Sequence, residues 1–316
     1  MDLVEAPRAE ALEKRLDEIV QTSGPVLGKV LDPVLRRRGK RLRPRLLLAI
    51  AGEAAGSPAI TCAAGVELLH LSSLIHDDLM DQAPARGGAP AVHAAHGPAM
   101  AVVSGDFLVA AGIGALSSAD DGRPAAAGLR AYADMCRGQA METASRHRLL
   151  DVDDYLRVIA GKTGALFRAA CLIGARLAGL DRAKVARAGR FGLAAGVLYQ
   201  LVDDLLDLCA TSAETGKPVG QDLANGVYTL PALLASRRYG GAFTRHLGRG
   251  PDGLAVARDM ATREDVLIEV AGYARRYAAV AERGADALPP GPVRDRLTEL
   301  PGRLLDRVTP GSRVAP

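Results

Sequence analysis

The sequence contains no tryptophan and few aromatic residues of any kind, which restricts the core that it can form. Of the 316 residues, 48% are hydrophobic but only 3% are Phe, Trp or Tyr, so Ala, Leu and Val must fill the interior. β-Sandwich cores draw on aromatic and β-branched residues, whereas closely packed helices accept small aliphatic side chains. The composition therefore favours a helical protein, long enough for one large core or two modest ones.

Cysteine and long apolar runs are scarce as well. The four cysteines are far apart and form no CxxC or Cys/His pattern, which argues against a disulfide scaffold or zinc site and for reduced thiols in the cytoplasm. The first 20 residues are charged and helical in pattern, unlike a signal peptide. No uncharged apolar run reaches the roughly 18 residues that span a bilayer. We expect a soluble, cytoplasmic protein without stable membrane insertion.

The charge of the chain gives little indication of a macromolecular partner. The formal net charge is +4 and is spread along the sequence, so neither a nucleic-acid stripe nor a membrane-binding patch follows from it. We expect no nucleic-acid partner. Lysine is rare beside arginine, which makes each lysine informative, and Lys40, Lys162 and Lys217 lie in the motifs described below.

Helical periodicity recurs along almost the whole chain. Leu12, Leu16 and Val20 form one apolar stripe, while alternating strand patterns are scarce. Most breaks between periodic segments are short, so neighbouring helices should pack antiparallel. The sequence predicts one all-α domain of about ten or more helices over residues 1–308, followed by a frayed tail over 309–316.

Two DDxxD clusters stand inside otherwise apolar helical segments. The first is Asp77, Asp78 and Asp81, and the second is Asp203, Asp204 and Asp207. On a helix, residues i and i+4 share a face, so the first and last aspartates of each cluster should point together. Burying such like charges without compensation costs about several kcal/mol per ion, so we expect a cation between them.

The cation that fits these ligands is magnesium. Only oxygen ligands are offered, and Mg²⁺ completes its octahedron with water and substrate phosphates. The clusters therefore predict a diphosphate held by metal ions between two facing helices. The alternative, a solvated acidic face that repeats the motif by chance, requires two coincidences within apolar surroundings.

A basic loop and a histidine accompany the first cluster. The loop runs from Arg38 to Pro44, where Lys40 and Arg43 offer an ammonium and a guanidinium fork to phosphate oxygens. His70 precedes Asp77 by seven residues, two helical turns on the same face. With Gly161–Gly164 (GKTG) and Gly216–Leu223 (GKPVGQDL), these motifs resemble the trans-isoprenyl diphosphate synthase (polyprenyl synthetase) family from about Gly39 to Pro231.

The resemblance implies the fold, the reaction and the site residues. The fold would be a single-domain isoprenoid synthase bundle around a central cavity, forming a homodimer. The reaction would be the condensation of isopentenyl diphosphate with an allylic diphosphate. Three Mg²⁺ ions would be held by Asp77, Asp81 and Asp203 and supported by the other aspartates. Isopentenyl diphosphate would contact Lys40, Arg43 and His70; the allylic diphosphate would contact Arg86, Lys162 and Lys217; Thr163 and Gln200 would face the carbocation.

Two positions depart from the family pattern. Gly87 replaces the second arginine of an RRG motif, which removes a phosphate contact of the isopentenyl site, and Val227 replaces a lysine near the second cluster. Both changes favour the alternative of a terpene synthase-like diphosphate lyase or cyclase, whereas Lys40, Arg43 and His70 argue against it. A non-catalytic prenyltransferase subunit would be expected to lose its aspartates, and this chain keeps all six.

Small side chains before the first cluster bear on product length. Ser73 lies four residues before Asp77, one turn deeper on the same face, and Ser72 lies beside it. An aromatic residue there would stop the chain after about three isoprene units, so the sequence favours a C20 product. Phe107 on the next helix is a candidate floor for the growing tail.

Overall fold

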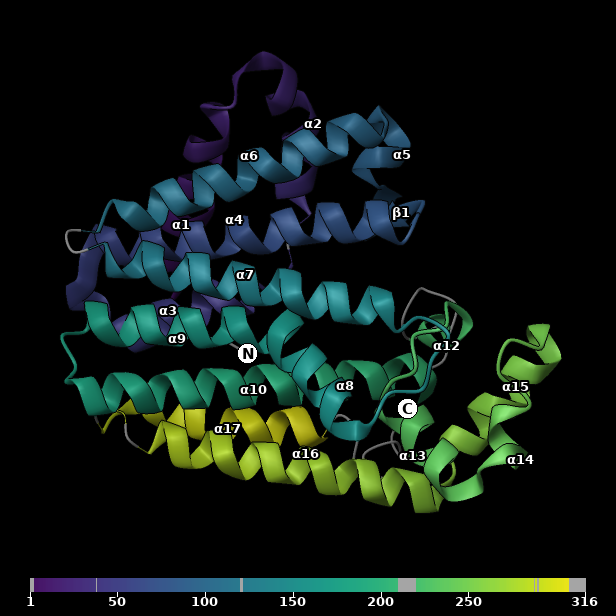
Figure 1. Ribbon diagram of the computed structural model, residues 1–316. Helices are drawn as coiled ribbons and strands as arrows, with labels where there is room; N and C mark the ends of the chain where they lie inside the picture. Colours follow the sequence, from purple (N-terminus) through teal and green to yellow (C-terminus); the bar gives the residue numbers. More distant parts are fainter. Residues whose placement is uncertain are drawn as a thin grey trace. The chain divides into compact units, whose positions relative to one another are not determined.

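The computed structural model describes residues 3–37, 39–119, 122–209, 220–286, 288 and 290–306. Backbone contacts group the chain into two compact units: unit 1 comprises Met1–Tyr132 and Leu166–Gly189, and unit 2 comprises Ala133–Ala165 and Arg190–Pro316. Nearly every described element is a helix (Figure 1). The all-α prediction is confirmed, and the predicted tail over 309–316 lies outside the described residues.

Unit 1 is built on two long apolar helices, α4 and α6. They pack along each other, and α6 returns beside α4 after a short hairpin (Figure 1). Helices α1 and α3 also pack on α4. The elements are α1 (Ala6–Gln21), α2 (Gly24–Arg36), α3 (Leu42–Ala51), η1 (Glu53–Ala55), α4 (Gly56–Met80), β1 (Ala85–Arg86), β2 (Ala89–Pro90), α5 (Val92–His96) and α6 (Pro98–Ser117).

Glycine allows α4 and α6 to approach closely. A Cβ atom added to Gly65 would lie 2.8 Å from the carbonyl oxygen of Gly112, and one added to Gly112 would lie 2.9 Å from that of Gly65. Any side chain at either position would push the two backbones apart, because helix interiors are packed without spare volume. The two glycines thus allow the close helix packing on which a core with few aromatic residues depends.

Unit 2 has a core of Leu, Ala and Val around α13. This helix packs against α15 and α16, and α16 packs against α17. Buried Leu201, Leu205, Leu230 and Phe243 belong to one hydrophobic cluster of this unit. The elements are α8 (Val152–Ile159), the π-helical turn η2 (Ala160–Gly164), α12 (Gln221–Ala224), α13 (Leu230–Tyr239), α14 (Gly241–Thr244), α15 (Gly250–Ala261), α16 (Glu264–Ala285) and α17 (Pro292–Asp306).

Three further helices include the positions at which the chain passes from one unit to the other. They are α7 (Arg123–Ala144), α9 (Ala165–Leu177) and α10 (Arg182–Cys209). The central cavity expected from the resemblance stays a prediction. Among the described residues, the four cysteines form no disulfide, as their spacing predicts.

The strands are limited to one small hairpin in the described part of the chain. Ala85 pairs with Pro90 and Arg86 with Ala89. The two residues between the strands, Gly87 and Gly88, have φ of 57° and 79°. Positive φ at both central residues is what a type I′ turn requires, and glycine adopts it without steric cost.

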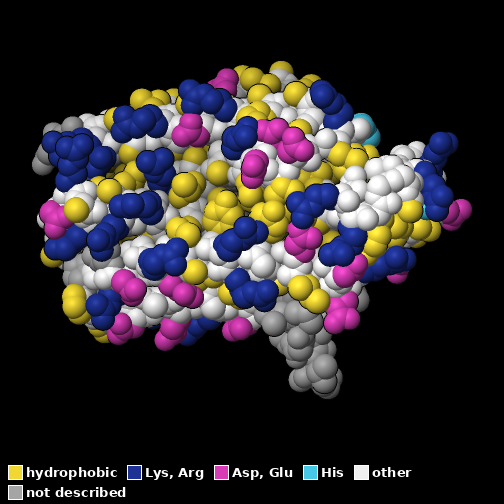
Figure 2. Space-filling view, turned by 60° about the horizontal axis from the view of Figure 1, so that its bottom comes forward, with side chains coloured by type: hydrophobic (Ala, Val, Ile, Leu, Met, Phe, Trp, Pro, Cys, Tyr) yellow, Lys and Arg dark blue, Asp and Glu magenta, His cyan; other side chains and the backbone are white. Residues whose placement is uncertain are grey.

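The surface and the helix lengths bear on possible partners. On the face drawn in Figure 2, Lys and Arg side chains are dispersed among acidic and hydrophobic ones. Three segments, Glu53–Met80, Pro98–Ser117 and Val152–Leu177, are long and apolar enough to cross a membrane by length and composition alone. Each of these segments contains charged residues, so none of them is an uncharged apolar run. The expected lack of membrane insertion and of a nucleic-acid partner stays a prediction.

Candidate active site

The first aspartate cluster forms the end of α4. Asp81 is the C-cap residue of this helix, and its backbone N–H donates to the carbonyl of Asp77 at 2.9 Å. Asp77 is half-buried and Asp81 exposed, whereas Asp78 is buried with 4% of its surface accessible. The helical spacing therefore sends the outer two aspartates towards solvent and the middle one inward.

Arg86 holds the buried carboxylate of Asp78. Its Nε donates to Asp78 Oδ1 at 2.7 Å. Burial raises the pKa of Asp78, while the Arg86 charge and hydrogen bond, and the charges of Arg37 and His93, act to lower it. The hairpin turn at Gly87 places Arg86 where it can make this contact, so the Arg86 guanidinium is fixed beside the cluster.

Arg43 and His70 form a second polar pair in unit 1. Arg43 Nη1 lies 3.0 Å from His70 Nε2, and because a guanidinium can only donate, Nε2 must accept. Burial, together with the charges of Arg43, Arg86 and Arg41, lowers the pKa of His70 well below its ordinary value. The imidazole is therefore neutral, and its proton is on Nδ1. The Arg43 guanidinium also lies 4.6 Å from the centre of the Phe167 ring.

Two cations of the basic loop differ in burial. Lys40 is exposed, so its ammonium is accessible. Arg41 is buried and has a φ of 46°; it donates to Glu67 at 2.8 Å, to Glu13 at 3.1 Å and to the Leu35 carbonyl at 3.0 Å. This structural role is not apparent in the sequence, where Arg41 is one more basic residue in a basic loop.

The second cluster lies on α10, and its middle aspartate is also buried. Asp203 is exposed, Asp207 half-buried, and Asp204 has 4% of its surface accessible. Tyr155 Oη donates to Asp204 Oδ2, and Gln200 Nε2 donates to Asp204 Oδ1 at 2.6 Å. Burial raises the pKa of Asp204 to about 7, although both hydrogen bonds act in the opposite direction. Tyr155 was missed from the sequence, where it lies 49 residues from its partner.

The GKTG motif forms the π-helical turn η2. Its Lys162 Nζ lies 2.6 Å from Glu142 Oε1, and Thr163 Oγ1 donates to Gln200 Oε1 at 2.7 Å. Single π-turns shift the backbone pairing away from the i to i+4 pattern and are frequent at functional sites. A Cβ atom on Gly138 would lie 2.5 Å from the Lys162 backbone nitrogen, so a glycine of α7 is needed for the turn to be accommodated.

Asp222 extends the acidic group around the second cluster. Its backbone N–H lies 3.3 Å from Asp207 Oδ2, and its carbonyl accepts from Val227 N at 2.8 Å. Loss of solvent contact, followed by the charges of Asp204, Asp207 and Glu142, raises the pKa of Asp222 well above its ordinary value, while Lys162 acts to lower it. In the sequence, Asp222 is recognised only as part of the GKPVGQDL motif. Lys217 of the same motif lies outside the described residues.

The carboxylates suit a metal ion that the substrate helps to bind. Within the described ranges, no group of three His, Cys, Asp or Glu side chains converges on a complete metal site. Mg²⁺ does not need one, because it is commonly held by one or two carboxylates plus water and substrate phosphates. The outer pair of each cluster offers hard oxygen ligands at i, i+4 spacing, so these residues fit such an ion.

The structure thus brings together most of the predicted residues within their own units. Arg43, His70, Arg86 and Asp78 form a continuous group in unit 1. Lys162, Thr163, Gln200 and Asp204 form another in unit 2. That the two clusters face each other stays a prediction.

Comparisons with known proteins show the family to which the chain is similar. Residues 24–250 match the family model described as Polyprenyl synthetase. The chain is 34% identical over 288 residues to a nonaprenyl diphosphate synthase from Mycobacterium tuberculosis, covering 85% of each. It is 36% identical over 255 residues to a geranylgeranyl diphosphate synthase from the same organism, covering 78% of this chain and 72% of the other. A solved polyprenyl synthase from Caulobacter crescentus, complexed with calcium and isoprenyl diphosphate, has a TM-score of 0.88 and 29% identity, covering 96% of this chain and 95% of that one.

Proposed function

Because the chain belongs to the polyprenyl synthetase family, whose members join prenyl units into prenyl diphosphates, we propose that it is a magnesium-dependent synthase of a C20 prenyl diphosphate. The observation that carries the proposal is the group in unit 1, where Arg43 and His70 lie beside Arg86 and the end of the first cluster. Two adjoining cationic positions suit two diphosphates.

Isopentenyl diphosphate would be bound by Lys40, Arg43 and His70. Lys40 is exposed and contributes a mobile ammonium, while the Arg43 guanidinium is held between His70 and the Phe167 ring. Since Arg43 occupies Nε2 of a neutral His70, the Nδ1–H remains as its donor. Fixing an arginine in advance reduces the entropy lost when it grips a phosphate.

The allylic diphosphate would be bound at the aspartates with Arg86, Lys162 and Lys217. Asp77, Asp81, Asp203 and Asp207 would hold Mg²⁺, which neutralises phosphate charge as the leaving group departs. Asp78 and Asp204 would act less as ligands than as anchors, since each already accepts hydrogen bonds from the protein. Three ions with substrate bound remains our expectation.

The reaction transfers the allylic group to the isopentenyl double bond. The C–O bond of the allylic diphosphate breaks with both electrons leaving on diphosphate, and the isopentenyl π electrons form the new C–C bond. The resulting cation loses a proton to the departing diphosphate, which gives the longer prenyl diphosphate and free diphosphate. Thr163 and Gln200 would stabilise the positive charge with oxygen dipoles, and Arg86 and Lys162 the leaving group.

The C20 product length is argued from α4. Ser73 is small, and its hydroxyl donates to the His70 carbonyl at 2.8 Å, so it does not obstruct the level one turn before Asp77. At Ser72 the hydroxyl lies 2.9 Å from the Tyr132 hydroxyl, which brings an aromatic ring from α7 to that side of the helix. We propose that the tail passes on the Ser73 side of α4 and that Phe107 of α6 limits it.

We further propose a homodimer that uses α6. Val102 and Val103 of this apolar helix have 44% and 51% of their surfaces exposed, and Leu129 of α7 has 53%. A single exposed apolar residue is ordinary, but a long apolar helix with neighbouring exposed valines is typical of an interface. Light scattering of the purified protein tests this, with a monomer at micromolar concentration as the contradicting result.

The proposed function is tested by incubating the protein with Mg²⁺, radiolabelled isopentenyl diphosphate and a C5, C10 or C15 allylic diphosphate. Label in a C20 prenyl diphosphate supports the proposal, and label in longer products corrects only the length. Consumption of the allylic substrate without incorporation of label identifies the lyase or cyclase alternative. Omission of Mg²⁺ with EDTA present should abolish incorporation.

A further inference from the structure

The hairpin next to the first cluster lacks one cation that the isopentenyl site of the proposed function needs. Gly87 stands where the family pattern has the second arginine of RRG. The backbone leaves no simple alternative within the hairpin, because Gly88 is also without a side chain and Ala89 and Pro90 carry no charge. A replacement has to come from another part of unit 1.

Arg37 reaches this hairpin from the end of α2. It is the C-cap residue of that helix, and its Nη2 donates to the Pro90 carbonyl at 2.6 Å. Pro90 pairs with Ala85 at the base of the hairpin, and Ala85 is two residues from Gly87. Two residues of strand measure about 7 Å, which is close to the length of an arginine side chain. The Arg37 guanidinium is therefore held at the base of the hairpin that carries Gly87.

The charge of Arg37 acts on Asp78 of the first cluster. It is one of the positive charges that, with Arg86, lower the pKa of the buried Asp78 against the effect of burial. Arg37 Nε is buried and makes no hydrogen bond to any described residue. A guanidinium has five N–H donors, so the bond to Pro90 fixes its position and leaves donors for an anion.

We propose that Arg37 provides the phosphate contact of the isopentenyl diphosphate site that Gly87 cannot make. The cation is thus moved from the hairpin turn to the end of α2 and held there by the Pro90 carbonyl. This inference rests on the proposed function, because it concerns the second diphosphate of the same reaction. It also explains how a chain with RGG in place of RRG can keep the number of cations that bind isopentenyl diphosphate.

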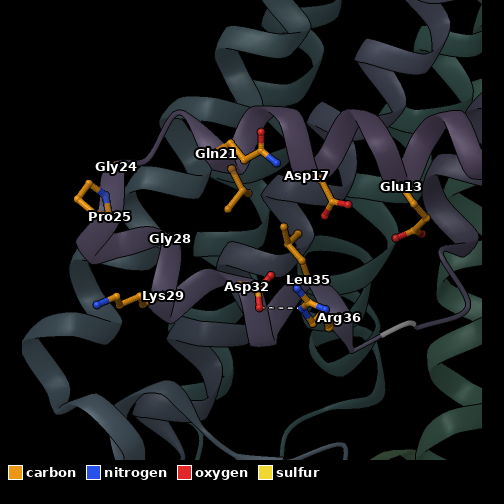
Figure 3. A pocket seen from close by; sticks show the side chains of 11 residues that line it. Glu13, Asp17, Gln21, Gly24, Pro25, Gly28, Lys29, Asp32, Leu35 and Arg36 are labelled. Atoms are coloured by element: carbon orange, nitrogen blue, oxygen red, sulfur yellow. Dashed lines mark hydrogen bonds and ion pairs between the residues drawn. The ribbon is translucent and has the colours of Figure 1, made fainter.

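The neighbouring Arg36 is a matched control. It has the same charge one residue earlier, but its Nε is paired with Asp32 at 2.7 Å and 78% of its side chain is exposed. Figure 3 shows Arg36 turned towards Asp32 along the cavity of about 720 Å³ between α1 and α2, whose lining includes no hairpin residue. Its removal changes the net charge of the protein equally and leaves the hairpin untouched.

The test compares Arg37→Gln with Arg36→Gln by calorimetric binding of isopentenyl diphosphate and by steady-state kinetics. Glutamine removes the charge and is two bonds too short to reach the Pro90 carbonyl as Nη2 does, so this variant loses the charge and the hairpin anchor together. We expect Arg37→Gln to raise the Kd and the KM for isopentenyl diphosphate by about tenfold. The KM for the allylic substrate should stay within twofold of the wild-type value. Arg36→Gln should leave all three constants within twofold, and Arg37→Lys should recover most of the binding because it restores the charge.

The outcomes separate this inference from the proposed function. The role of Arg37 would be overturned if both glutamine variants weakened the binding of isopentenyl diphosphate equally. It would also be overturned if Arg37→Gln weakened only the binding of the allylic substrate, or changed neither. Thermal melting identifies a folding defect, and Arg37→Lys recovery of binding distinguishes a charge effect from it. If the wild type binds isopentenyl diphosphate but never incorporates it, the proposed function fails while the Arg37 comparison still stands. A wild type that does not bind it overturns both.

Discussion

Thr163 and Gln200 are joined by a hydrogen bond in which the Thr163 hydroxyl donates to Gln200 Oε1 at 2.7 Å. Because the amide oxygen is thereby turned to Thr163, its nitrogen faces Asp204 and donates to it at 2.6 Å. Tyr155 donates to the other oxygen of the same carboxylate. The second cluster is thus fixed through its middle residue, as the first is fixed by Arg86 holding Asp78. In both clusters the outer aspartates stay on the more accessible side.

Replacing Tyr155 by Phe should destabilise the protein by about 1–3 kcal/mol, because a buried carboxyl group loses a donor. The change removes only the hydroxyl that reaches Asp204. Tyr239→Phe is the matched control, since Tyr239 donates to Asp265 at 2.7 Å and Asp265 is 43% exposed. Water can replace that hydroxyl, so we expect a loss below about 1 kcal/mol. Urea unfolding measures both, and equal losses would contradict the anchoring role of Tyr155.

Asp81→Ala should lower Mg²⁺-dependent turnover by at least about 100-fold, since it removes an oxygen ligand at the place where leaving-group charge develops. Asp81 is exposed at the end of α4, so folding should be unaffected. Asp134→Ala removes an aspartate that pairs with Arg137 on the surface of α7 and should retain turnover within twofold. A near-normal rate in Asp81→Ala at saturating Mg²⁺ would exclude the first cluster as the metal site.

The types of residue that form the site could be predicted from the sequence better than the contacts that these residues make. The aromatic-poor composition and the i, i+4 spacing were sufficient for the all-α fold and for the shared direction of Asp77 and Asp81. They could not assign Asp78 and Asp204 to the interior, because that depends on Arg86 and Tyr155, which approach only in the folded chain. Local periodicity carries no information on contacts between distant segments. Arg41 was missed for the same reason.

The pair of Arg43 and His70 predicts a pH dependence of stability. Burial, with Arg43, Arg86 and Arg41 nearby, lowers the pKa of His70 well below 6.5 in the folded protein. Below pH 6.5 the unfolded chain therefore binds a proton that the folded protein does not. The free energy of unfolding should fall with decreasing pH, with a contribution from His70 of up to about 1.4 kcal/mol per pH unit, and no such contribution arises above that pH.

His70→Asn should remove this part of the dependence. The difference in unfolding free energy between wild type and variant should change between pH 7 and pH 5 and stay constant above pH 7. His96→Asn, at an exposed position on α5, should leave the wild-type profile unchanged. Urea unfolding at each pH supplies the measurement. A difference that does not vary with pH would mean that His70 titrates alike in the folded and unfolded states.

Ser73→Phe should shorten the product. Ser73 lies on α4 one turn before Asp77, and its hydroxyl donates to the His70 carbonyl at 2.8 Å. A phenyl ring there would obstruct a growing tail one turn before Asp77, so we expect C15 to replace C20 as the main product. Ser117→Phe, at an exposed position on α6 with a comparable bond from its hydroxyl to the Ile113 carbonyl, should leave product length unchanged. Chromatographic sizing of dephosphorylated products measures both, and unchanged length in Ser73→Phe would show that the tail follows another route through the helices.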